Sequence, residues 1–137
     1  MRSFKYAWKA LVSLFLFDVS AAAAEKKEFT AKTDPDGTQR VDILAGSYFF
    51  DPNNIIVKVN VPVELKITKE PGMIPHDIVL KAPEAGIDFW QELKETPEII
   101  KFTPTKIGTY PFTCDNNVLF FESHKDKGIV STLEVRD

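Results

Sequence analysis

Short segments in which apolar and polar residues alternate run through the chain from about residue 40, and this pattern predicts β-strands. The clearest segments are 55–60 (IIVKVN) and 63–68 (VELKIT), which alternate at period two and contain many β-branched residues. Further strands are expected at 41–44, 77–81, 98–102, 108–113 and 130–135. The turn signal at 51–54 (DPNN) and spaced prolines separate these segments. The pattern as a whole predicts an all-β sandwich.

One stretch does not read as a simple strand, and two aromatic clusters stand out. Residues 85–95 (AGIDFWQELKE) predict one short helix or irregular excursion, because their apolar residues do not alternate with period two. The aromatic clusters 48–50 (YFF) and 89–90 (FW) are expected to belong to the hydrophobic core.

The N-terminal residues 1–24 have the order of a secretory signal peptide. A positively charged start is followed by the apolar run 10–17 (ALVSLFLF) and then by small residues, so cleavage is expected after Ala24. A membrane span needs about 20 predominantly apolar residues, and Asp18 interrupts this run too early. We therefore expect a protein exported to the periplasm or beyond, with no membrane span after the signal is removed.

The remaining chain has the length of one domain and carries a negative charge. Residues 25–39 are charged and rich in turn formers, so we expect a loose lead-in or an edge element, followed by a single domain at 40–137. Removing the leader's three basic residues and one acidic residue from the chain's 17 and 20 leaves 14 against 19, a net charge of −5. This balance argues against nucleic acid or an anionic membrane as the main partner. It suits a monomer that meets a partner with a basic face.

The chain contains one cysteine and two histidines, and their placement predicts a metal site. His76 directly precedes the predicted strand 77–81, Cys114 follows the strand 108–113, and His124 comes after nine further residues. A single cysteine in an exported protein is an intermolecular bridge, a reactive thiol or a metal ligand. Two imidazoles and one thiolate form the trigonal set that suits a blue-copper electron-transfer site.

Zinc would require a further ligand. A structural zinc site takes four ligands from the protein, and the sequence offers carboxylates near the three donors at Asp77, Asp115 and Glu122. A nucleophilic enzyme is a third possibility, with Cys114 attacking and a histidine as base, but no orienting residue or oxyanion feature is visible.

At these residues the chain resembles the cupredoxins, the family of plastocyanin, azurin and auracyanin. The resemblance lies in His76 ahead of a strand, the pattern Tyr110-x-Phe112-x-Cys114, a loop with His124, and a final strand, and it covers about 41–135. It implies a Greek-key β-sandwich in which His76, Cys114 and His124 bind one copper ion.

The chain departs from the family pattern around His124. The loop between Cys114 and His124 is longer than in most single-copper members, and no Met follows His124 as a weak axial ligand. Ile129, Glu122, Met73 or a backbone carbonyl remain open for the axial position. A two-copper centre would need a second cysteine, and the loop contains none.

Other residues near the predicted ligands have possible supporting roles. The apolar run 118–121 (VLFF) would cap the core, form a docking patch, or both. Asp77 and Asn116 or Asn117 are candidates for orienting the ligand loop.

The sequence thus favours an exported mononuclear copper protein that transfers single electrons between redox partners and is not an enzyme. The alternatives are a periplasmic copper carrier or chaperone, and a metal-free module of the same fold that only docks to a partner. A carrier would typically add Met- or His-rich segments, and this chain has two of each residue.

Overall fold

The computed structural model describes residues 26–47, 49–72, 76–114 and 131–137, with the backbone alone for His76. Ten strands and one short 3₁₀ helix make up these described residues. In chain order they are β1 (Glu28–Thr30), β2 (Gln39–Ala45), β3 (Phe50–Asp51), β4 (Asn54–Lys58), β5 (Val63–Lys69), β6 (His76–Ala82), η1 (Pro83–Ala85), β7 (Ile87–Leu93), β8 (Glu98–Phe102), β9 (Gly108–Phe112) and β10 (Ser131–Arg136). The predicted all-β fold is confirmed.

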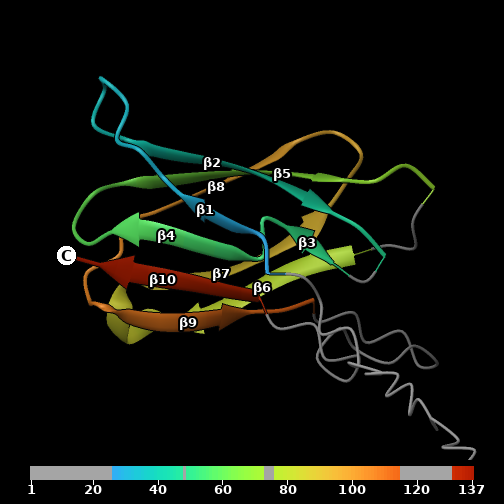
Figure 1. Cartoon of the computed structure of the whole chain (residues 1–137). Coiled ribbons are helices and arrows are strands. Elements are labelled where there is room, and N and C mark those ends of the chain that lie inside the picture. The colour runs from blue at the N-terminus through green and yellow to red at the C-terminus, as the bar shows by residue number, and fades with distance from the viewer. Residues whose placement is uncertain (1–25, 48, 73–75, 115–130) are drawn as a thin grey trace, which may run out of the picture.

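The strands form two layers (Figure 1). One sheet has the order β1-β4-β10-β9 and the other has the order β3-β2-β5-β8, while β6 and β7 form an antiparallel hairpin. Both sheets are mixed, because β2 pairs with β5 and β4 pairs with β10 in parallel, whereas β9–β10 and β5–β8 are antiparallel. The β6–β7 hairpin joins β9 through Val79 and Thr113, whose backbone N–H groups each donate to the other's carbonyl oxygen at 2.8 and 3.0 Å.

The hydrophobic core lies between the two layers. Along β2 every second residue is buried, and β5 and β10 follow the same alternation, as strands with one face on a core must. Phe50 and Phe112 meet across the core edge to face, with 5.3 Å between ring centroids. The first four residues of β4 are all buried, and β1 and β10 flank this strand in the sheet.

The prediction for residues 85–95 was wrong, because most of this stretch is a strand. After the three-residue helix η1, β7 pairs along its whole length with β6, from Ile87 opposite Ala82 to Leu93 opposite His76. Within the described residues β7 pairs with β6 alone, so it is an edge strand, and its exposed positions are Asp88, Trp90 and Glu92. A strand of this kind has no clean period-two pattern to read from the sequence.

The aromatic clusters are only partly in the core. Phe50 is buried and Phe89 stacks on Phe102 with 5.7 Å between ring centroids. The core assignment was wrong for Phe49 and for Trp90, which is 56% exposed. Tyr48 lies outside the described residues.

The lead-in before β2 contributes a strand to the fold. Glu28–Thr30 pairs in parallel with β4 and forms the edge of its sheet, and Lys27 accepts backbone hydrogen bonds from Asn53 and Asn54. Within the described ranges no helix is long and apolar enough to cross a membrane.

Candidate metal centre

Cys114 lies at the end of the sandwich where β9 finishes and β6 begins. Its side chain is 3% exposed and belongs to the hydrophobic core. The pairing of Val79 with Thr113 sets β6 beside the chain that leads into Cys114. A thiol in this position is shielded from water and lies two residues beyond the well-packed Phe112.

Asp77 is a described side chain in hydrogen-bonding contact with this sulfur. The Cys114 thiol donates to Asp77 Oδ1, with 3.6 Å between Sγ and Oδ1, and the Trp90 indole N–H donates to Asp77 Oδ2 at 2.8 Å. Asp77 is only 9% exposed, so its carboxylate lies in a site where buried polar atoms need partners. Asp77 was also a candidate for orienting the ligand loop, and that role stays a prediction because the loop lies outside the described residues.

His76 is the first residue of β6 and is therefore next in the chain to Asp77. Its backbone pairs with Leu93 of β7. Because Asp77 contacts Cys114, the backbone of residue 76 and the Cys114 sulfur lie at the same end of the molecule. The His76 side chain is outside what the structure describes.

The other predicted site residues fall outside the described ranges. These are His124, the axial candidates Met73, Glu122 and Ile129, the loop residues Asp115, Asn116 and Asn117, and the apolar run 118–121. The two described ends of the segment with His124 are neighbours, since Ser131 pairs with Phe112, two residues before Cys114. The segment therefore leaves and re-enters the sandwich at the end where Cys114 lies.

The one predicted donor whose side chain is described, Cys114, has the chemistry of a ligand for a soft metal. The chain's single thiol is buried, pre-placed by a hydrogen bond and adjacent to the strand that begins with one of the two histidines. Thiolate and imidazole are the ligand types that suit copper and zinc. No group of three or more His, Cys, Asp or Glu side chains that could hold a metal ion is found among the described residues, where neither imidazole is included.

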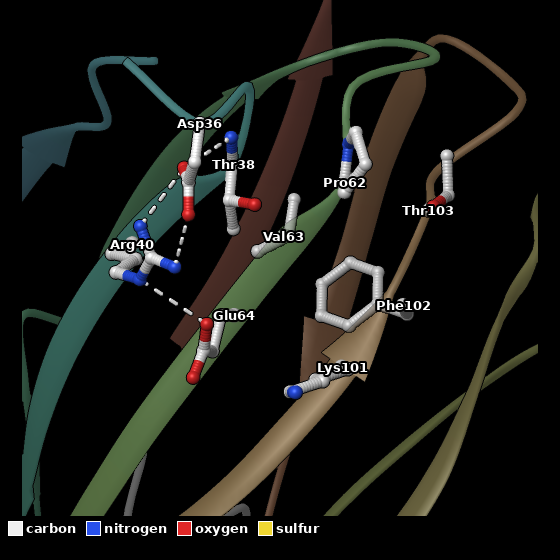
Figure 2. Close-up of a pocket in the computed structure, with 9 residues that line it drawn as sticks. All are labelled: Asp36, Thr38, Arg40, Pro62, Val63, Glu64, Lys101, Phe102 and Thr103. Carbon is white, nitrogen blue, oxygen red and sulfur yellow. Dashed lines mark hydrogen bonds and ion pairs between the residues drawn. The ribbon is translucent and has the colours of Figure 1, made fainter. Parts of the chain in front are cut away.

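A separate polar hollow of about 490 Å³ lies at the opposite end of the sandwich (Figure 2). Arg40 there contacts Asp34, Asp36 and Glu64 at 3.0, 2.6 and 3.2 Å. The hydrogen bond from Arg40 lowers the pKa of Asp36 to about 2, and the same contact raises the pKa of Arg40. The guanidinium of Arg40 already faces three carboxylates, so Arg40 is engaged within the protein.

The strand directions show that this hollow is remote from Cys114. The Gln39 side chain, next to Arg40, bonds the backbone at the end of β4, and β10 runs parallel to β4. β9 runs antiparallel to β10, so β9 starts at the Arg40 end and finishes, with Cys114, at the other.

The sequence reasoning missed Trp90 as part of the site. Trp90 lies in a segment without period-two alternation, so the strand that carries it was not predicted. Its neighbour Phe89 suggested that both residues pack in the core. The indole N–H, a group that needs an acceptor when partly buried, was the available signal.

Comparisons with known proteins show similarity in structure. No protein-family model matches the chain, and no curated protein matches its sequence. Among solved structures, the metal-binding domain of the Cu(I)-exporting P-type ATPase CopA of Streptococcus pneumoniae is similar with a TM-score of 0.61 and 17% identity, covering 82% of this chain and 99% of that chain. A copper-binding protein solved by NMR in its apo form has a TM-score of 0.60 and 18% identity, covering 82% and 100%.

Reduced auracyanin from Roseiflexus castenholzii is also similar, with a TM-score of 0.52 and 20% identity, covering 78% of this chain and 99% of that chain. At these identities the similarity concerns the fold. Together with the all-β sandwich of two mixed sheets, it shows that this chain has the cupredoxin-like fold.

Proposed function

We propose that this protein is an exported copper protein that binds one copper ion through His76, Cys114 and His124 and transfers single electrons between redox partners. The observation that carries the proposal is the buried Cys114 thiol at the end of the sandwich, held by the residue next to His76. The similar solved structures, which include copper-binding proteins and auracyanin, support copper as the metal.

The chain's own residues account for what an electron-transfer site needs. His76, Cys114 and His124 would hold the copper ion, which would supply a one-electron couple to this set of two imidazoles and one thiolate. Burial of Cys114 excludes water from the sulfur. In the metal-free protein the carboxylate of Asp77, itself held by Trp90, accepts the thiol proton and holds the sulfur in position.

The proposal includes no substrate turnover and no membrane span in the mature protein. We propose a periplasmic or otherwise exported location because residues 1–24 have the pattern of a signal peptide. The acidic mature chain would attract a redox partner with a basic face, and salt would weaken this attraction.

The test is copper binding by the full chain and by Cys114→Ser. We expect one copper per wild-type molecule with strong visible absorption from sulfur-to-copper charge transfer, and loss of that absorption in Cys114→Ser. Thr113→Ser, a neighbouring control, should leave the absorption unchanged. A Cys114→Ser protein with the wild-type colour would exclude Cys114 as a ligand and with it the proposed site.

A copper carrier is the second candidate, and the similarity to the metal-binding domain of a Cu(I)-exporting ATPase favours it. The two functions differ in how firmly the protein keeps its metal. An electron carrier should exchange electrons with small redox reagents many times while retaining copper against a competing chelator. If the protein lost Cu(I) to the chelator as fast as its copper was reduced, it would be a copper carrier.

A further inference from the structure

Two hydrogen bonds in series link the surface of the protein to the buried sulfur. The exposed indole of Trp90 donates to one oxygen of Asp77, and the other oxygen accepts the proton of the Cys114 thiol. The exposed fraction falls from 56% at Trp90 to 9% at Asp77 and 3% at Cys114. One carboxylate thus connects a surface ring to the sulfur of the candidate metal centre.

The position of Trp90 explains why Asp77 is buried. Alternate residues of β6 share a face, and on the face of Asp77 the next two are the half-buried Val79 and the exposed Lys81. Trp90 pairs with Val79 across the hairpin, which makes it a diagonal neighbour of Asp77. Lys81 is already paired with Asp88 at 2.9 Å.

The chemistry of the indole makes it a fixed anchor. An indole nitrogen is a donor only, whereas a carboxylate accepts at either oxygen. With Oδ2 held by Trp90, the carboxylate plane is set and Oδ1 faces the sulfur. Loss of that donor removes one of the hydrogen bonds that fix the buried carboxylate, and losing a hydrogen bond at a buried charged group is costly.

We propose that Trp90 is a positioning residue of the candidate metal centre, which anchors Asp77 so that the carboxylate holds the Cys114 sulfur in one orientation before any metal binds. The part of this inference that concerns metal affinity rests on the proposed function. Binding of the metal replaces the S–H bond with a metal–sulfur bond and releases the proton to solvent. A sulfur that is already placed loses less conformational freedom in that step.

The first experiment needs no metal. The rate of Cys114 alkylation by iodoacetamide is measured in the full chain, whose one cysteine is Cys114. Trp90→Phe keeps an aromatic ring over Asp77 but removes the N–H, and we expect alkylation about tenfold faster, the equivalent of one hydrogen bond to a charged group. Ile107→Ala is the matched control, because Ile107 is equally exposed, at 56%, and lies at the other end of β9.

A double-mutant cycle tests whether Trp90 acts through Asp77. In an Asp77→Ala background the further change Trp90→Phe should leave the alkylation rate unchanged. Equal rates in wild type and Trp90→Phe would overturn the proposal. If Trp90→Phe raised the alkylation rate as much in the Asp77→Ala background as in wild type, the proposal would also be overturned. Trp90 would then only shield Cys114 from solvent, without acting through Asp77.

The second experiment adds copper alone. We expect Trp90→Phe to bind one copper with about tenfold lower affinity and a shifted sulfur-to-copper absorption band, while Ile107→Ala matches wild type. Wild-type affinity and an unshifted band in Trp90→Phe would overturn the metal-related part. If no variant, wild type included, binds copper, the proposed function fails, and the alkylation cycle still decides the positioning role.

Discussion

Arg40 and Asp36 illustrate how much a single exposed contact changes the chemistry of one group. The carboxylate of Asp36 accepts hydrogen bonds from the Arg40 guanidinium and from the Thr38 backbone N–H, and its pKa falls from 3.8 to about 2. Both partners lie on the surface, so salt screens the ion pair and its contribution to stability is small.

This pKa predicts a pH dependence of stability. Because the pKa of Asp36 is depressed in the folded state, its contribution is present above pH 4 and is lost as the pH falls from about 4 to 2. In Arg40→Gln the pKa of Asp36 should return toward 3.8, measured by NMR titration of the carboxyl group. The stability difference between wild type and Arg40→Gln should shrink over the same pH interval. An Asp36 pKa that stays near 2 in Arg40→Gln would assign the shift to the backbone bond with Thr38.

Gly86 makes a second residue-level prediction. Its φ is +74°, and a Cβ built there would lie 2.6 Å from the carbonyl oxygen of Thr103. Gly37 has a φ of +85° but no atom within 4 Å of such a Cβ. Gly37→Ala should cost about 1 kcal/mol for the left-handed backbone, and Gly86→Ala about 1–3 kcal/mol more for the added crowding. Denaturant unfolding of both variants measures the difference, and equal losses would show that the crowding is relieved elsewhere.

Among the secondary structure elements, the start of β2 is tied to the turn between β4 and β5 by one buried side chain. Gln39, 1% exposed, donates to the carbonyl oxygens of Lys58 and Val61 at 3.0 and 3.2 Å and accepts from the Lys58 backbone N–H at 2.7 Å. These bonds satisfy backbone groups where β4 ends and the chain turns toward β5. They connect the two sheets at the end opposite Cys114.

Loss of this side chain should destabilise the fold. Gln39→Ala leaves buried backbone groups unpaired, and we expect a loss of about 2–3 kcal/mol in the free energy of unfolding. Gln91→Ala is a suitable control, since the Gln91 side chain donates to the carbonyl oxygen of its neighbour Glu92 in an exposed hydrogen bond, and the change should alter stability by less than about 0.5 kcal/mol. A Gln39→Ala protein as stable as the control would mean that water replaces the lost bonds.

For the whole molecule, the two-layer core implies that folding does not depend on a metal. The core joins residues of both sheets, including Phe50 and Phe112, and Cys114 is one member of a large apolar cluster. A small zinc finger, by contrast, has too little core to fold without its metal.

We therefore expect the copper-free protein to show a cooperative thermal unfolding transition. Copper should raise the midpoint by binding the native state, by the equivalent of about 2.7 kcal/mol at a hundredfold excess over Kd. Cys114→Ser should unfold cooperatively too but respond much less to copper. A copper-free protein that is disordered and folds only when copper is added would contradict this expectation.

The period-two pattern was enough to locate most strands. Segments 63–68 and 98–102 agree closely with β5 and β8, because one face of each strand is buried and the other is not. The same reasoning failed for β7, whose environment at a sheet edge leaves both faces partly wet, and for Trp90, which lies outside the core. Which residues of an edge strand are buried depends on contacts with strands distant in the sequence, and the local sequence does not show those contacts.

The residue types of the candidate site could be read from the chain, because one thiol and two imidazoles are few enough to stand out. Their surroundings could not, because Asp77 and Cys114 are 37 residues apart and meet only through the Val79–Thr113 pairing of β6 with the end of β9. Trp90 reaches Asp77 only through the register of the β6–β7 hairpin. Local alternation reports which residues face a core, whereas contacts between distant strands depend on how the sheets close, a property of the whole chain.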